Sequence, residues 1–374
     1  MTEKILLKDL LFNQAKVEQI AGEIHRVNPS FKRSDFVHTV VAKFPELELK
    51  ARISWIADCL ENYLSSDYKN VVGILVKALP AQNNPALSDG DFGDFIYAPY
   101  AEYVAKNGCS KKHLKLSLNA LYEITKRFSV EDAIRYFINA FPQETLSELS
   151  KWSKDSHYHV RRLSSEGTRP KLPWSQKISI QITEPLPILD NLFSDNTRFV
   201  TRSVANHIND ISKIDPKLAV DMLAKWKKSE KQESKEMDYI IRHALRTLIK
   251  QGNKDAMGLL GVSHEPRLSV TNLNVSETVK MNTSLEFSFE IKAKENVELI
   301  VDYILYFQNK SGQPNSRKVF KLKKFSLSKN KATTLTKLHL MRENMTTRKL
   351  FRGEHGLEIQ INGKSFGKQS FWVV

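Results

Sequence analysis

The chain has 374 residues, of which 41% are hydrophobic and 26% charged, a balance typical of a folded protein with an ordinary core. Its 57 basic and 42 acidic residues leave a formal net charge of +15, which favours phosphate polymers as partners. No apolar run approaches the roughly 20 residues that span a bilayer, no signal peptide is recognisable, and Cys59 and Cys109 have no metal-ligand spacing. We therefore expect a soluble, cytoplasmic monomer with no membrane partner, no metal and no cofactor.

Helical periodicity dominates the first part of the chain. From Leu10 to about Leu79 apolar residues recur every three or four positions, which predicts one helix after another. Residues 80–100 break this pattern with Pro, Asn and Gly and are interpreted as a loop that contains several aromatic side chains. Helical spacing resumes at Leu114 and again at Ala133.

A repeat of 40 residues follows over about 145–255. It places Val160, Val200 and Ile240 in register, and Arg162, Arg202 and Arg242 keep the same step. Asp155 and Asp195 precede the first two members at a constant offset. An Asp-containing turn followed by an apolar helix carrying Arg is typical of stacked helical repeats, whose neighbours bury each other and leave a concave surface. The three arginines either form a ladder along that surface or pack their stems between helices.

A β-rich segment begins after about residue 264. Short runs alternate between apolar and polar residues, and Asn362-Gly363 is a strong hairpin signal. This pattern predicts a small immunoglobulin-like β-sandwich at 263–374, after a helical-repeat domain at 1–262. Residues 264–374 carry 19 basic and 10 acidic residues, so most of the excess charge lies there. The densest basic cluster predicts phosphate contacts by Lys318, Lys321 and Lys323.

Residues 152–174 combine cations and aromatic side chains. A helix carrying Arg161 and Arg162 is expected to end at Gly167, and a Pro-containing loop then presents Arg169, Lys171 and Trp174. Cationic forks beside an exposed aromatic ring suit a nucleic-acid backbone and an unstacked base. Arg161 has a second interpretation, since an Asp in a turn and an Arg six positions later often tie neighbouring repeats. His157 and His159 lack a third metal ligand, so we expect them to contact solvent or phosphate.

The run from Val160 to Trp174 resembles the signature of the AlkC family of DNA alkylation repair glycosylases. Residues 123–128 and 133–135 upstream, and 202–213 downstream, agree with the same family. The resemblance spans essentially the whole chain, because some members carry a C-terminal immunoglobulin-like module. It implies HEAT-like repeats that wrap DNA in the bacterial cytosol or nucleoid, and removal of 3-methyladenine or 3-methylcytosine without extruding the base. The related AlkD branch has a Trp where this chain has Asn206, so the aromatic cradle of that branch is not transferred.

Three carboxylates are candidates for the chemistry. A cationic base is a good leaving group, and a nearby carboxylate can stabilise the oxocarbenium-like transition state or orient water. Glu123 is the first choice because it stands beside two cations, although pairing with Arg127 at i+4 would explain it equally well. Glu166 lies in the motif but near a helix end, where it could instead bond a backbone group or Arg169. Asp210 could equally cap a neighbouring helix.

The sequence therefore predicts a DNA glycosylase of base excision repair that acts on cationic N3-methylated bases in double-stranded DNA. The alternatives are a helical-repeat scaffold that binds nucleic acid without catalysis, and a solenoid whose basic face meets acidic proteins. The predicted DNA contacts are Arg127, Arg161, Arg162, Arg169, Lys171, Trp174, Arg202, Asn206, Arg242, Lys318, Lys321 and Lys323.

Overall fold

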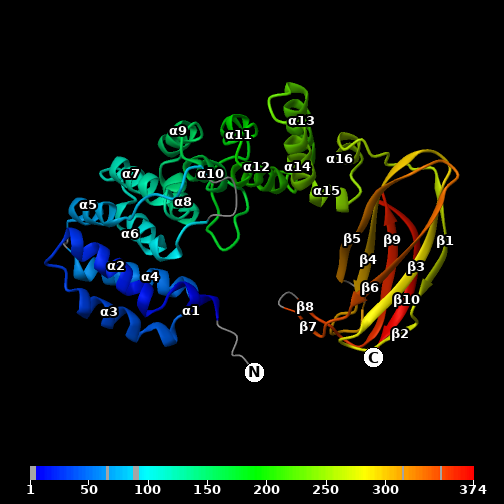
Figure 1. Ribbon diagram of the computed structural model, residues 1–374, viewed down its shortest axis with the longest axis horizontal. Coiled ribbons are helices and arrows are strands. Elements are labelled where there is room, and N and C mark those ends of the chain that lie inside the picture. Colours follow the sequence, from blue (N-terminus) through cyan, green and yellow to red (C-terminus); the bar gives the residue numbers. More distant parts are fainter. Residues whose placement is uncertain (1–5, 65–66, 87–91, 314–315, 346–347) are drawn as a thin grey trace. The chain divides into compact units, whose positions relative to one another are not determined.

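The computed structural model describes residues 6–64, 67–86, 92–313, 316–345 and 348–374. By internal packing the chain forms two compact units, residues 1–211 with 226–240, and residues 212–225 with 241–374. The first unit is helical, and the second combines helices with a β-sandwich (Figure 1). The expected fold class, mostly α with a small all-β domain, is confirmed, while the domain boundary at 262 stays a prediction.

The N-terminal helices follow the predicted periodicity. Their apolar stripes make one core, to which Ile20, Ile56 and Leu121 contribute fully buried side chains. Among the described residues, no helix is both long and apolar enough to span a membrane. The helices are α1 (Leu7–Leu11), α2 (Gln14–Val27), α3 (Arg33–Ala42), α4 (Leu49–Tyr63), α5 (Tyr68–Ala78), α6 (Ala98–Gly108), α7 (Leu114–Thr125) and α8 (Glu131–Ala140), with short 3₁₀ turns η1 (Phe44–Glu46) and η2 (Phe95–Tyr97).

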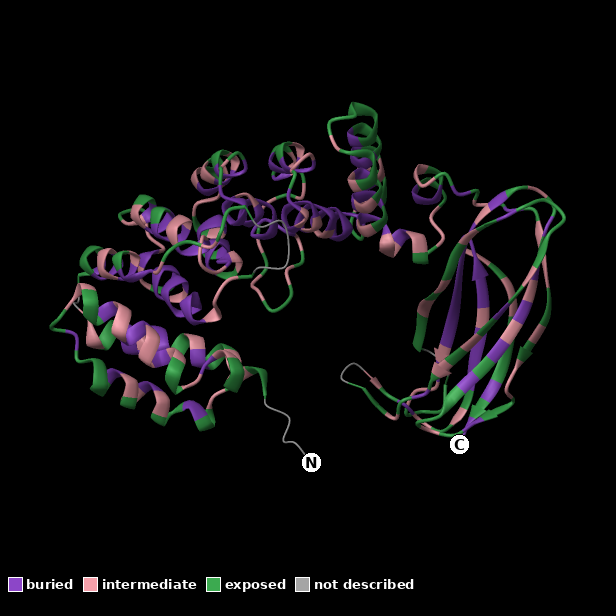
Figure 2. Ribbon diagram, viewed as in Figure 1, coloured by how far each residue is buried: buried purple, intermediate pink, exposed green. Residues whose placement is uncertain are grey.

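The 40-residue repeat corresponds to stacked helix pairs. In the first unit, α9 (Pro142–Trp152) pairs with α10 (Tyr158–Glu166), and α11 (Leu186–Leu192) pairs with α12 (Arg198–Ile211). The helices α10 and α12 are buried along most of their length (Figure 2). Val160 and Val200 occupy equivalent, fully buried positions in them. Asp155 and Asp195 lie in the preceding turns, where each carboxylate accepts the main-chain N–H two residues later. The repeat inferred from spacing is thus present as a structural unit.

The chain continues with α13 (Pro216–Ser229), α14 (Ser234–Ala244), α15 (Arg246–Lys250) and α16 (Lys254–Leu259). Gly252 follows α15 with a φ of +73°, the left-handed conformation that ends many helices. Met257 and Val262 pack with Ile300 of the sandwich, all three nearly or fully buried. The last helix is therefore part of the same core as the adjacent strand.

The sandwich consists of two main sheets. One has the strand order β1-β3-β6 and the other β2-β10-β9-β4-β5, while β7 and β8 form a separate ribbon. Inward-facing residues of both sheets, such as Phe287 and Leu305, make a continuous core. The strands are β1 (Leu268–Val275), β2 (Thr278–Val279), β3 (Ser284–Ala293), β4 (Val297–Phe307), β5 (Ser316–Leu327), β6 (Ala332–Leu340), β7 (Asn344–Met345), β8 (Arg348–Lys349), β9 (Gly353–Ile361) and β10 (Lys364–Val373).

The predicted Asn362-Gly363 hairpin joins β9 to β10, and both of its residues have positive φ, of 47° and 78°. The Asn362 side chain is fully buried and donates to the Ser263 carbonyl at 2.8 Å and to the Glu298 carbonyl at 3.1 Å. A Cβ added at Gly363 would lie 2.1 Å from the Gly252 Cα, so two main chains touch directly here. The hairpin thus joins the end of α15 to the sandwich without any intervening side chain.

Candidate functional site

The candidate site is built where α10 ends. A Cβ at Gly167 would lie 2.6 Å from Cγ2 of Ile134, so glycine lets the end of α10 press against α8. The chain then leaves the helix through residues 168–176, which we call the motif loop. The motif loop returns Arg169 toward α12, and this brings side chains that are distant in sequence together.

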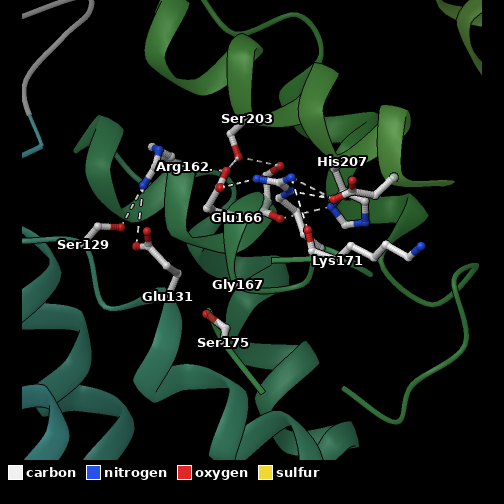
Figure 3. A network of polar contacts seen from close by, with 12 residues as sticks. Ser129, Glu131, Arg162, Glu166, Gly167, Lys171, Ser175, Ser203 and His207 are labelled. Atoms are coloured by element: carbon white, nitrogen blue, oxygen red, sulfur yellow. Dashed lines mark hydrogen bonds and ion pairs between the residues drawn. The ribbon is translucent and has the colours of Figure 1, made fainter. Parts of the chain in front are cut away.

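Arg169 bridges two buried carboxylates. Its Nη1 donates to Oε1 of Glu166 at 2.6 Å, and its Nε donates to Oδ2 of Asp210 at 2.9 Å. Glu166 is 5% exposed and Asp210 is 2% exposed, so both charges lie largely out of water. Figure 3 shows this network around Glu166 and His207. Two of the three carboxylates selected from the sequence are therefore brought to one site, with Arg169 between them.

The second oxygen of Glu166 is also engaged. Ser203 on α12 donates its hydroxyl to Oε2 at 2.6 Å, and Nη2 of Arg162 lies 3.7 Å from the same atom. Burial alone would raise the pKa of Glu166, but Arg162, Arg169 and Ser203 together hold it below its ordinary value. The carboxylate is therefore ionised at neutral pH and fixed at both oxygens.

Arg162 links Glu166 to the start of α8. Its Nη1 donates to the Ser129 hydroxyl at 2.8 Å and lies 3.7 Å from Oε2 of Glu131. The guanidinium also lies over the Phe199 ring, 4.4 Å from its centroid. Arg162 is 7% exposed, so its stem and much of its head pack between helices.

Sequence inspection missed four residues of this network: Ser129, Glu131, Ser203 and His207. Ser203, His207 and Asp210 lie at spacings of four and three on α12, so they share one face, and this spacing could have revealed them. His207 is fully buried, its Nδ1 contacts the Ser165 carbonyl at 3.0 Å, and burial lowers its pKa to about 4. It is therefore neutral beside the carboxylate pair.

Glu123 occupies a different environment. It lies on α7, where its two oxygens pair with Nζ of Lys126 at 2.8 Å and with Nη1 of Arg127 at 3.2 Å. Nε of Arg127 donates to the Pro80 carbonyl at 2.9 Å. The i+4 pairing that the sequence offered as an alternative is therefore present. The Glu123 side chain is 36% exposed, the most accessible of the three candidate carboxylates.

Arg161 makes the contacts expected of a tie between repeats. Its guanidinium forms two hydrogen bonds with the carboxylate of Asp195, at 2.5 and 3.1 Å. Nη1 also donates to the main-chain carbonyls of Asp155 and Ser156, both at 2.9 Å. Its donors are directed into the protein, although a DNA contact by Arg161 stays a prediction.

The motif loop presents Trp174 to solvent. Trp174 is 84% exposed. Its φ is 63°, a left-handed conformation that is uncommon for residues other than glycine. Lys50 Nζ donates to the Trp174 carbonyl and lies 3.3 Å from Asp132. A pocket of about 420 Å³ lies between α4, α6, α8 and the motif loop, with Trp174 and Glu131 in its wall. The loop is thus anchored while its tryptophan projects outward.

The remaining predicted DNA contacts differ in exposure. Arg202 and Asn206 are half-buried on α12, and Arg242 is exposed on α14. Lys171 in the motif loop is also exposed, as are the β5 side chains Lys318, Lys321 and Lys323.

The expectation that His157 and His159 contact solvent or phosphate is wrong. Both are buried, at 3% and 1% exposure, and they pack with Tyr158 and Phe199 in an aromatic cluster. Nδ1 of His157 accepts the main-chain N–H of His159 and so caps the start of α10. Their apolar ring faces, rather than their charge, explain their position.

Similar proteins agree with this architecture. The family described as DNA alkylation repair enzyme matches residues 102–248, and the C-terminal Ig-like domain of the uncharacterised protein YhaZ matches residues 269–374. YhaZ of Bacillus subtilis is 31% identical over 368 residues, which cover 97% of this chain and 98% of that protein. The alkylpurine DNA glycosylase AlkC of Pseudomonas fluorescens, solved bound to DNA containing an abasic site analog, is 31% identical. Its structure covers 99% of this chain and 100% of its own, with a TM-score of 0.89.

A helical-repeat unit with this network, followed by an immunoglobulin-like sandwich, defines a DNA alkylation repair enzyme. The chain belongs to the AlkC family of DNA alkylation repair glycosylases, and it is a DNA glycosylase. The resemblance found in the sequence is thereby confirmed. Family membership also favours the enzyme over the non-catalytic scaffold and over the protein-interaction solenoid.

Proposed function

We propose that this glycosylase hydrolyses the N-glycosidic bond of 3-methyladenine or 3-methylcytosine in double-stranded DNA, without extruding the base. The solved relative bound to DNA containing an abasic site analog supports DNA as the partner. The net charge of +15 supports the same partner, because released counterions favour association with phosphates.

The chemistry requires little beyond a fixed negative charge. The bond between C1′ and the base nitrogen breaks, and its electron pair neutralises the cationic base. Positive charge then develops on the sugar, water adds its oxygen to C1′, and the water proton is released. A carboxylate in a site of low dielectric stabilises that sugar cation more strongly than one in water. A base that already carries a positive charge needs no general acid, so extrusion into a pocket is not required for protonation.

The observation that carries the proposal is the Glu166–Arg169–Asp210 arrangement within the family match. We assign the stabilising negative charge to this pair of carboxylates. Arg169 prevents their mutual repulsion, and Ser203 keeps Glu166 from rotating. Glu123 is the second candidate, because its greater exposure would allow direct contact with the sugar or with water.

The predicted phosphate contacts divide into two groups. In the helical unit, the motif loop supplies exposed Lys171 and Trp174, and α12 supplies half-buried Arg202 and Asn206. Nearly all of Arg162 is buried, so we assign it to Glu166 rather than to phosphate. In the second unit, the exposed lysines of β5 supply a basic strand. Contacts contributed by both units would offset the few kcal/mol that DNA bending costs.

Release of free base from methylated duplex DNA tests the proposal. Wild type should release base, and Glu166→Gln and Asp210→Asn should each lower the single-turnover rate at least about 100-fold. Binding of each variant to undamaged duplex should stay within about twofold, which separates catalysis from binding. Loss with Glu123→Gln alone would move the catalytic role to α7. No release by wild type would refute the proposed substrates.

The route of the base is tested separately. A 2-aminopurine at the target position becomes more fluorescent when it leaves the stack. Binding without extrusion should leave its emission near that of the free duplex, whereas a several-fold rise would contradict this part of the proposal.

A further inference from the structure

Arg135 is a buried cation that the chemistry described above does not use. It lies on α8 and is 1% exposed. Its Nε donates to the Gln176 carbonyl at 2.6 Å, and its Nη1 donates to the carbonyls of Gly167 and Arg169 at 3.0 and 2.8 Å. One planar guanidinium therefore holds both ends of the motif loop.

No carboxylate in the described ranges lies within ion-pair distance of Arg135. The charge is instead neutralised at longer range: Asp132, Asp210 and Glu166 favour the cation, while Arg169 opposes it. Burial lowers its pKa to about 10, so Arg135 remains protonated at neutral pH. The guanidinium is bound only by main-chain carbonyls, and a buried cation without a nearby anion is costly to desolvate.

Asn139, one helical turn later on α8, provides an internal comparison. Its Nδ2 donates to the Lys177 carbonyl at 2.9 Å, and its Oδ1 accepts the Ser179 main-chain N–H at 2.9 Å. A neutral amide is therefore enough to hold the chain beyond the motif loop. The cation occurs only where the loop passes the Glu166 and Asp210 carboxylates.

We propose that Arg135 is a positioning residue for the glycosylase reaction. It fixes the main chain of Arg169, so that the Arg169 side chain keeps Glu166 and Asp210 in one geometry. This inference rests on the proposed role of those two carboxylates. Besides the buried Glu166 and Asp210, the network of Arg135, Arg162 and Arg169 includes the half-buried Glu131.

Two substitutions separate the two parts of this role. Arg135→Gln removes the charge and the fork, whereas Arg135→Lys keeps the charge but cannot span the carbonyls. Under single-turnover conditions with 3-methyladenine duplex, we expect a rate about 100-fold lower for Arg135→Gln and about tenfold lower for Arg135→Lys, because small misplacements are costly. Affinity for undamaged duplex should stay within about twofold for both.

The pH–rate profile gives the readout that a purely structural role would not change. Glu166 faces Arg162, Arg169 and Ser203, and Asp210 faces Arg169 and the neutral His207. Loss of the Arg135 charge removes a cation that interacts with Glu166 and so raises the pKa of that carboxylate, and the acid limb of the profile should move to higher pH in Arg135→Gln. In Arg135→Lys the acid limb should stay in place.

Asn139→Ala is the matched control, because it loosens the adjacent segment without removing charge. It should leave the rate within about threefold and the acid limb unchanged. The inference is overturned if Arg135→Gln keeps the wild-type rate and profile, or if its losses equal those of Asn139→Ala. If Arg135→Gln does not fold, a wild-type rate in Arg135→Lys overturns it equally. Wild type and Glu166→Gln, run alongside, show separately whether the proposed substrate and carboxylate are correct.

Discussion

Removal of one hydroxyl group should measure how strongly the buried carboxylate depends on its donors. In Ser203→Ala, Oε2 of Glu166 loses the donor that lies 2.6 Å away, while Arg169 and Arg162 remain in place. Hydrogen bonds to charged groups contribute about 1.5–3 kcal/mol each. For a unit of this size, that loss should lower the melting temperature by about 3–12 °C.

The effect should depend on pH in a defined direction. The pKa of Glu166 is below its ordinary value in the folded protein, so its interactions contribute stability above the unfolded pKa. That stability is lost as the pH falls through the folded pKa. The penalty of Ser203→Ala should therefore be complete at pH 7 and shrink as the pH falls through the folded pKa of Glu166, where the carboxylate becomes protonated.

Thermal unfolding followed by circular dichroism at several pH values is the assay. Ser164→Ala is the control, since Ser164 is equally buried on α10 but its hydroxyl donates only to the Val160 carbonyl of its own helix, at 3.3 Å. It should cost no more than about 1 kcal/mol, without pH dependence. Equal penalties for the two variants, or a penalty independent of pH, would show that Glu166 does not rely on Ser203.

Four further outcomes are expected. Arg161→Met should destabilise the helical unit by about 3–5 kcal/mol, because Asp195 would stay buried without its partner, and urea unfolding checks this. Trp174→Ala should weaken binding to abasic duplex by about 1–3 kcal/mol while leaving the melting temperature unchanged; equal binding in titrations would exclude stacking by the exposed indole. Burial raises the pKa of Asp302 to about 6, so its ionisation opposes folding progressively from the ordinary carboxyl pKa upward and fully above about pH 6; in thermal scans Asp302→Asn should therefore stabilise the sandwich more at pH 8 than at pH 5, and have little effect near pH 3. Neutralising three exposed lysines of β5 together should lower the slope of log affinity against log salt by about 2–3, and an unchanged slope would remove this strand from the interface. Those residues are Lys318, Lys321 and Lys323.

Regular features of the fold could be predicted because they leave periodic or local signals. The spacing of Val160 and Val200 predicts the repeat, because each occupies the same buried position in its helix. Asn362-Gly363 predicts the hairpin, because few other residue pairs adopt two successive positive φ values. Such signals depend on the local chain and survive without knowledge of tertiary contacts.

The candidate site was only partly predictable, for a physical reason. Glu166 and Arg169 stand out as charges within an unusual motif, and Asp210 in a segment downstream of it, but the contact between Arg169 and Asp210 crosses 41 residues of chain. Arg135 carries no comparable signal, because an arginine within a helix is ordinary until its partners are known, and Ser203 shows only its helical spacing from His207 and Asp210. His157 and His159 were wrongly predicted to contact solvent or phosphate. Their polar residue type suggested exposure, but the packing of their rings buries them.

The contact between Gly252 and Gly363 has a consequence for how the gene can change. Two main chains touch there, so neither partner tolerates a side chain, and the two codons are constrained jointly although 111 positions separate them. Recombination that exchanged the sandwich for that of a distant relative would retain a fit only if the incoming piece brought its own helix end. Crossover points between Gly252 and the first strand should therefore yield poorly folded chimaeras, and those placed ahead of α15 should yield soluble ones.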